Sequence, residues 1–152
     1  MVRIVTASLA SMAALGGCSP KAALSAPGCS PPPAETLTRI IDADNARDLT
    51  KVLAEYTDDV VWLPPSRPST KGIEAIRSSY EGMYATFTPA LSITIGETMV
   101  GADLAVVIGQ TGGVLTPSAG DAVTVHDNFM AALRCEGGRW KVARMMWAPA
   151  SS

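Results

Sequence analysis

Residues 91–112, LSITIGETMVGADLAVVIGQTG, decide the fold of this chain, because they contain two β-rich runs and the turn that joins them. The runs are Leu91–Val100 and Leu104–Gly112, and the Gly-Ala-Asp between them has the composition of a hairpin turn. Two more β-rich runs follow, Val123–Arg134 and Trp140–Trp147, with a Gly-Gly turn between them. We therefore expect a four-stranded antiparallel meander, in which residues 112–120 form a longer and looser connection.

The chain before this meander is mainly helical in pattern. Leu37, Ile40 and Ile41 recur at helical spacing after a proline, and Asp48 is a suitable N-cap for a second helix. A β-rich stretch follows at 58–63, and Gly72 opens a third helix. This order predicts an α+β domain with three helices packed on a curved, mainly antiparallel sheet. Such a sheet encloses a cone open at one end, which is a common kind of ligand site.

The composition limits the possible functions. The 152 residues suffice for one domain of usual size, and 47% hydrophobic against 17% charged residues excludes a disordered chain or a coiled coil. The net charge is −2 and no block of like charge occurs, so we expect no nucleic-acid partner. The chain has a single histidine and no Cys or His spacing suited to a metal, so we expect neither a metal nor a cofactor.

The N-terminus has the pattern of a bacterial lipoprotein. A positive start at Arg3 precedes an apolar stretch over 4–15, which is too short to span a membrane, and Leu-Gly-Gly-Cys at 15–18 resembles a lipobox. We expect a signal peptide over 1–17, a lipidated Cys18 that begins a Pro/Ala/Ser-rich tether over 18–33, and a domain over 34–149. Lipid would then anchor the protein at the bacterial cell envelope, at the outer membrane or periplasmic face in a Gram-negative cell. A plain signal peptide with an incidental cysteine is the alternative.

Two other cysteines remain to be placed. Cys29 lies in the tether and Cys135 near the end of an expected strand. An oxidising envelope permits a disulfide between them, but the geometric test needs a structure, so the bridged and the free state both stay open.

Four short motifs in this order resemble the NTF2-like superfamily, in particular its SnoaL-like and DUF4440-type members. The motifs are DNARDL at 44–49, YTDDVV at 56–61, KGIEAIR at 71–77 and GRWKV at 138–142. The resemblance implies a cone-shaped α+β barrel that usually dimerises through the outer face of its sheet. Members of the superfamily include isomerases, cyclases, dehydratases, hydrolases and non-catalytic binding domains, so the resemblance implies the fold and leaves the function open.

The ketosteroid isomerases are the best-understood enzymes of this fold. Their general-base aspartate aligns with Pro64 and their oxyanion-hole tyrosine with Ile40, so the resemblance implies that ketosteroid isomerisation is lost here. At two other positions this chain has the same residue type as these enzymes. Their second oxyanion donor, an aspartate, matches Asp127, and the tyrosine that supports their hydrogen-bond network matches Tyr80.

Alternation along the strand predicts which side chains face the cone. If Asp127 points inward, Phe129 does too, and His126 points outward; a slip of one residue would reverse this and make His126 the base. The expected ligand-binding residues form an apolar and aromatic pocket: Trp62, Tyr80, Tyr84, Phe129, Met145 and Trp147. Asp127 is the candidate acid/base, because apolar surroundings disfavour the charged form of a carboxyl. Tyr80 is its candidate partner and His126 the second candidate for the base.

Three functions remain open at this point. The first is an envelope-anchored domain that binds a small apolar or aromatic molecule in its cone without catalysis. The second is an isomerase, lyase or cyclase that uses Asp127 as acid/base. The third is a module that dimerises through its sheet and has a filled cone. A homodimer is expected in any of these cases.

Overall fold

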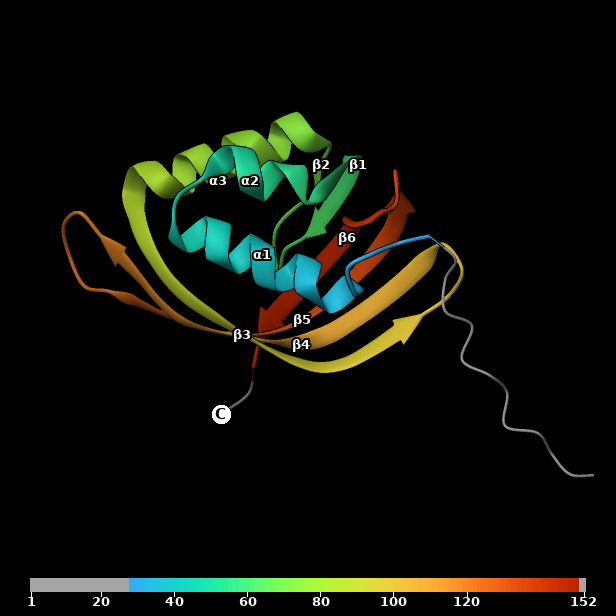
Figure 1. Ribbon diagram of the computed structural model, residues 1–152. Coiled ribbons are helices and arrows are strands. Elements are labelled where there is room, and N and C mark those ends of the chain that lie inside the picture. Colours follow the sequence, from blue (N-terminus) through green and yellow to red (C-terminus); the bar gives the residue numbers. More distant parts are fainter. Residues whose placement is uncertain (1–27, 151–152) are drawn as a thin grey trace, which may run out of the picture.

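In the computed structural model, which describes residues 28–150, three helices pack on one six-stranded sheet (Figure 1). The helices are α1 (Pro33–Asn45), α2 (Leu49–Ala54) and α3 (Ile73–Thr86). The strands are β1 (Tyr56–Leu63), β2 (Thr70–Lys71), β3 (Phe87–Val100), β4 (Leu104–Pro117), β5 (Val123–Glu136) and β6 (Arg139–Pro149). The expected signal peptide, Cys18 and the tether up to residue 27 lie outside the described residues. Among the described helices, none has the length and apolar character needed to cross a membrane.

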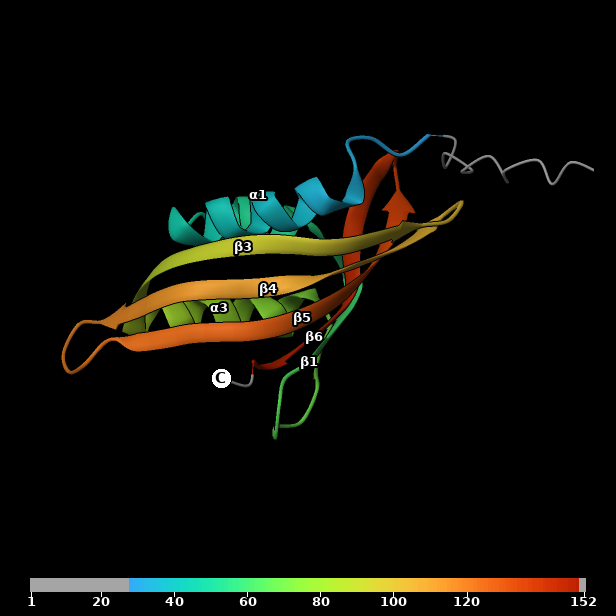
Figure 2. The same ribbon diagram turned by 90° about the horizontal axis from the view of Figure 1, so that it is seen from below.

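The sheet curves around α1 without closing into a full barrel. Its strand order is β2-β1-β6-β5-β4-β3, with β1 parallel to β6 and every other pair antiparallel. Figure 1 shows α1 in the curve of the sheet, with α2 and α3 farther from β3, β4 and β5, and Figure 2 shows α1 running alongside β3. The predicted α+β domain, three helices on a curved and mainly antiparallel sheet, is confirmed.

Local sequence explains where the helices begin. Pro33 occupies the first turn of α1, where the missing N–H costs nothing, and the apolar stripe after it is buried against the sheet. Asp48 caps α2, since its carboxylate accepts a hydrogen bond of 3.0 Å from the backbone N–H of Lys51. In α3 the side chains of Ile76, Tyr80 and Tyr84 are buried at helical spacing.

The expectation of a loose connection at 112–120 is wrong for residues 112–117, because the connection between the two strands covers only residues 118–122. β4 continues as a strand to Pro117, opposite a β3 that already begins at Phe87. Gly113 has φ +129° there, and a Cβ on it would lie 2.2 Å from the carbonyl oxygen of Ala90 on β3. The glycine is required by a close approach of two strands and marks no turn.

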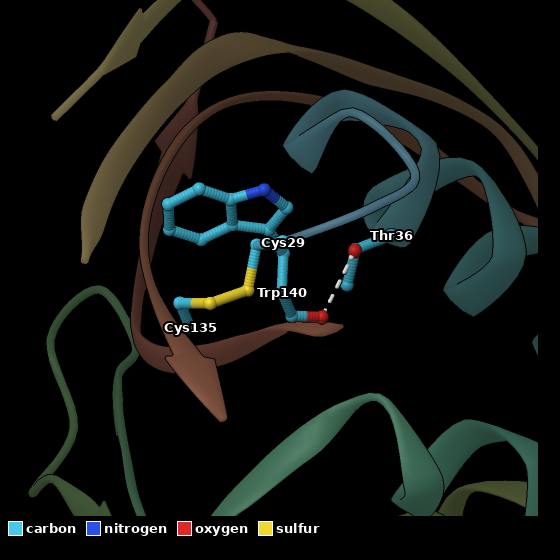
Figure 3. Close-up of a disulfide and its surroundings, with 4 residues drawn as sticks. All are labelled: Cys29, Thr36, Cys135 and Trp140. Atoms are coloured by element: carbon cyan, nitrogen blue, oxygen red, sulfur yellow. Dashed lines mark hydrogen bonds between the residues drawn. A yellow bond between two sulfur atoms is a disulfide. The ribbon is translucent and has the colours of Figure 1, made fainter. Parts of the chain in front are cut away.

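A disulfide joins Cys29, before α1, to Cys135 at the end of β5, so the bridged alternative is the one observed (Figure 3). The two Cα atoms are 5.9 Å apart. The neighbouring backbone is fixed as well, because Ser30 N–H donates to the carbonyl of Gly138 and the Thr36 hydroxyl donates to the carbonyl of Trp140 at 3.1 Å. The start of the domain is therefore tied covalently to the β5–β6 hairpin.

Candidate functional site

A cavity of about 250 Å³ lies between α1, α3 and the concave face of the sheet. Its wall is mainly aliphatic and aromatic, with two carboxyl groups, Asp44 and Asp127, among the apolar side chains. The full lining is Leu37, Ile40, Ile41, Asp44, Tyr56, Trp62, Tyr80, Met83, Leu91, Ile93, Thr111, Leu115, Val125, Asp127, Phe129, Met145 and Trp147.

The register of β5 decides which of its side chains reach this cavity. Phe129 pairs with Trp147 on β6, and Asp127 pairs with Thr111 on β4; all four line the cavity. His126 is exposed on the outer face, as strand alternation predicts, so the one-residue slip that would exchange it with Asp127 does not occur.

Most of the expected aromatic pocket lies together on the cavity wall. Trp62 and Trp147 pack edge to face with ring centroids 5.5 Å apart, and they leave the cavity open. Tyr84 is placed differently. It is buried beside Tyr80, with ring centroids 5.7 Å apart, but it does not line the cavity.

The hydroxyl of Tyr80 already has a protein partner. It lies 3.0 Å from the hydroxyl of Tyr56, and both side chains are buried. Burial raises the pKa of both tyrosines above the ordinary value, so both stay protonated at physiological pH. Because each hydroxyl has a proton, one donates to the other and the accepting hydroxyl keeps an O–H that is not used within the pair.

Asp44 on α1 is the polar residue of this wall that sequence reasoning missed. Its side chain is only 5% exposed, and its Oδ1 atom has no hydrogen-bond partner. Loss of solvent raises its pKa to about 6, and the nearby Tyr84 hydroxyl opposes this only partly. The two groups are neighbours without completing a hydrogen bond, since the Tyr84 hydroxyl is also unpartnered. The spacing 37-40-41-44 was the available signal, because it places Asp44 on the buried stripe of α1.

A third unpartnered polar atom belongs to the same region. The indole Nε1 of Trp62 is buried without an acceptor, and Trp62 lines the cavity. A carboxylate oxygen and an indole N–H, both buried and without partners, therefore belong to residues that line one largely apolar space. Among residues 28–150, no cluster of His, Cys, Asp and Glu side chains has the arrangement of a metal site.

A second hollow, of about 420 Å³, lies between α1, α2 and the start of β6. Its buried carboxylate, Glu55, is satisfied: Arg39 donates to both of its oxygens at 3.0 and 2.9 Å, and Arg139 donates at 3.1 Å. This network joins three segments of the fold, and none of the buried unpartnered atoms found among residues 28–150 belongs to a residue that lines this hollow. Of these two hollows, only the cavity around Asp44 is lined by residues with buried unpartnered polar atoms, so it is the candidate site.

Comparisons with known proteins agree with this architecture. The family model described as a SnoaL-like domain matches residues 37–143. A ketosteroid isomerase-like protein from Erwinia carotovora atroseptica SCRI1043 is similar in structure, with 27% identity and a TM-score of 0.71 over 79% of this chain and 95% of that one. No curated protein matches the chain.

Two further solved structures share the fold at lower identity. A conserved protein from Planctomyces limnophilus DSM 3776 has 24% identity and a TM-score of 0.71, covering 77% of this chain and 94% of that one. An NTF-2 like protein of unknown function from Shewanella oneidensis MR-1 has 19% identity and a TM-score of 0.62, covering 75% and 93%.

Proposed function

Because the chain belongs to the SnoaL-like domain family, we propose that its domain binds a small apolar or aromatic molecule inside the cone and is held at the bacterial envelope by lipid on Cys18. The observation that carries the binding proposal is the open, apolar cavity, two of whose lining residues, Asp44 and Trp62, each have a buried polar atom without a partner in the protein. Buried polar groups are normally hydrogen-bonded, so unpartnered ones facing a cavity favour a site completed by a bound molecule.

The size of the cavity limits the ligand. Its volume of about 250 Å³ is below the ~300–1,000 Å³ of sites for drug-sized molecules, which favours a compound of one or two rings. Trp62, Phe129 and Trp147 present aromatic surface on which a flat ring can pack.

An acid/base enzyme is the second candidate. Asp127 is half-buried on the cavity wall and Asp44 is fully buried on it, so two carboxyl groups in different surroundings face the same space. Two carboxyl groups in different surroundings suit the acid/base chemistry of an isomerase, lyase or cyclase. Pro64 and Ile40 replace the two principal residues of the ketosteroid isomerases, so that particular reaction is not proposed.

The outer face of the sheet supports the homodimer as a further proposal. Leu63, Met146 and Met130 lie side by side on β1, β6 and β5, and each is more than 40% exposed. A row of exposed apolar side chains is costly in a monomer and is typical of an interface. A second copy of the same sheet would cover it.

Calorimetric titration with benzofuran, a two-ring apolar molecule, tests the binding proposal. The matched variant is Val125→Trp, in which a larger side chain fills the cavity from β5. We expect benzofuran to bind the disulfide-bonded wild-type domain and not the folded variant. The proposal fails if benzofuran and similar two-ring compounds give no binding to the wild type, or if they bind the filled variant equally well.

A further inference from the structure

Asp44 brings an unpartnered carboxylate oxygen to the wall of the cavity. Its side chain is 5% exposed, its Oδ1 atom is unpartnered, and its neighbours on α1, such as Leu37 and Ile40, are apolar. An aliphatic side chain would fill this position without the desolvation cost of a carboxyl. A carboxyl group kept unpaired in such a place needs an explanation outside the protein's own contacts.

The surroundings of Asp44 contain hydroxyl donors, but none of them forms a hydrogen bond with its Oδ1 atom. Tyr56 and Tyr80 hydrogen-bond to each other, and the Tyr84 hydroxyl completes no bond. Arg47, after α1, donates to the backbone carbonyl of Tyr84 and stacks over its ring at 5.7 Å. The groups that could influence its protonation are Tyr56 on β1, Tyr80 and Tyr84 on α3, Arg47, and Asp127 across the cavity on β5. β3 and β4 contribute no titratable side chain to the cavity wall.

We propose that the Asp44 carboxylate is the specificity-determining acceptor of the cavity, and that it selects small ring compounds that carry an N–H or O–H donor. This rests on the proposed function and names the ligand class for the same site. The unpartnered Trp62 Nε1 is the complementary donor on the wall, available to an acceptor atom of the same ligand. A ligand donor satisfies the buried carboxylate, whereas an apolar ligand of equal shape leaves it unpaired.

Indole and benzofuran are the probes, because they have nearly the same shape and differ in having an N–H or an oxygen at one ring position. Neither probe ionises near neutral pH, so any pH dependence of binding comes from the protein. A hydrogen bond to a charged group favours indole by about tenfold or more at pH 7.5. This preference should decrease on acidification through pH 6, since protonated Asp44 is a weaker acceptor.

The variants separate this role from a structural one. Asp44→Leu should bring the ratio of the two dissociation constants close to one while benzofuran still binds, and Asp44→Asn should remove the pH dependence. Asp42→Asn is the control, since Asp42 is exposed on the same helix and does not line this cavity. A residue that only supports the fold would change both affinities together and leave their ratio unchanged.

Each outcome decides one of the two proposals. If benzofuran binds the wild type without discrimination from indole, or if Asp127→Asn abolishes the preference and Asp44→Leu does not, the role of Asp44 is refuted while ligand binding stands. If neither probe nor any similar ring compound binds the wild type, the proposed function itself fails. If indole is preferred only when Asp44 is present and ionised, both proposals are supported.

Discussion

Replacing Asp44 by Asn should stabilise the ligand-free protein increasingly as the pH rises. The folded-state pKa of Asp44 is about 6, against 3.8 for an ordinary aspartate, so between these values the folded state binds more protons than the unfolded state. The free energy of unfolding therefore falls as the pH rises through this window. A difference of about two pKa units corresponds to a total cost of about 3 kcal/mol at neutral pH.

The measurable quantity is the difference in unfolding free energy between Asp44→Asn and wild type. From the two pKa values, this difference should increase by about 2 kcal/mol between pH 4.5 and pH 7.5. Any fixed cost of burying the amide cancels in the comparison across pH. Urea denaturation followed by circular dichroism, with the disulfide intact, gives both free energies at each pH.

Asp42→Asn is again the matched control, because Asp42 is exposed on α1. The difference in unfolding free energy between Asp42→Asn and wild type should be nearly constant with pH. A constant difference for Asp44→Asn as well, or one that decreases as the pH rises, would refute the account of Asp44 as a desolvated and unpaired carboxyl.

Three other predictions concern the rest of the molecule. Removing the disulfide with the double variant Cys29→Ser, Cys135→Ser should lower the unfolding free energy by about 5 kcal/mol, the chain-entropy value for a loop of 106 residues; a loss below about 1 kcal/mol in urea would contradict this. Cys18→Ser should abolish labelling with radioactive palmitate and release the protein from the membrane fraction; unchanged labelling would disprove lipidation at this residue. Met130→Glu should shift a wild-type dimer to monomer in sedimentation velocity, and a monomeric wild type would remove the proposed interface.

Local signals were enough to predict most of the fold. The Gly-Ala-Asp turn at 101–103, the cap at Asp48 and the start of the third helix after Gly72 depend only on neighbouring residues, and the structure has all three. Gly113 was misread because a glycine required by the approach of β3 has the same local appearance as a turn glycine. The Cys29–Cys135 pairing also needed the fold, since 106 residues separate two cysteines whose Cα atoms are 5.9 Å apart.

The candidate site was predictable only in part, because it is assembled across the fold. Strand alternation places Phe129 and Asp127 on the concave face and His126 outside, and these positions agree with the structure. Asp44 was overlooked although it falls on the apolar stripe of its helix. Whether Asp44 has a hydrogen-bond partner depends on the side chains that β1 and α3 place around it. The spacing of residues along α1 does not predict those neighbours.

The central claim is that the cone holds a small organic molecule, and native mass spectrometry of the domain tests it most directly. The domain would be purified gently from the envelope of its own organism, as Cys18→Ser to remove the lipid, beside the same protein carrying Val125→Trp. The account predicts a bound mass of one- or two-ring size on the first protein and none on the second. A spectrum of the first protein without any bound molecule, or an equal adduct on the filled variant, would contradict it.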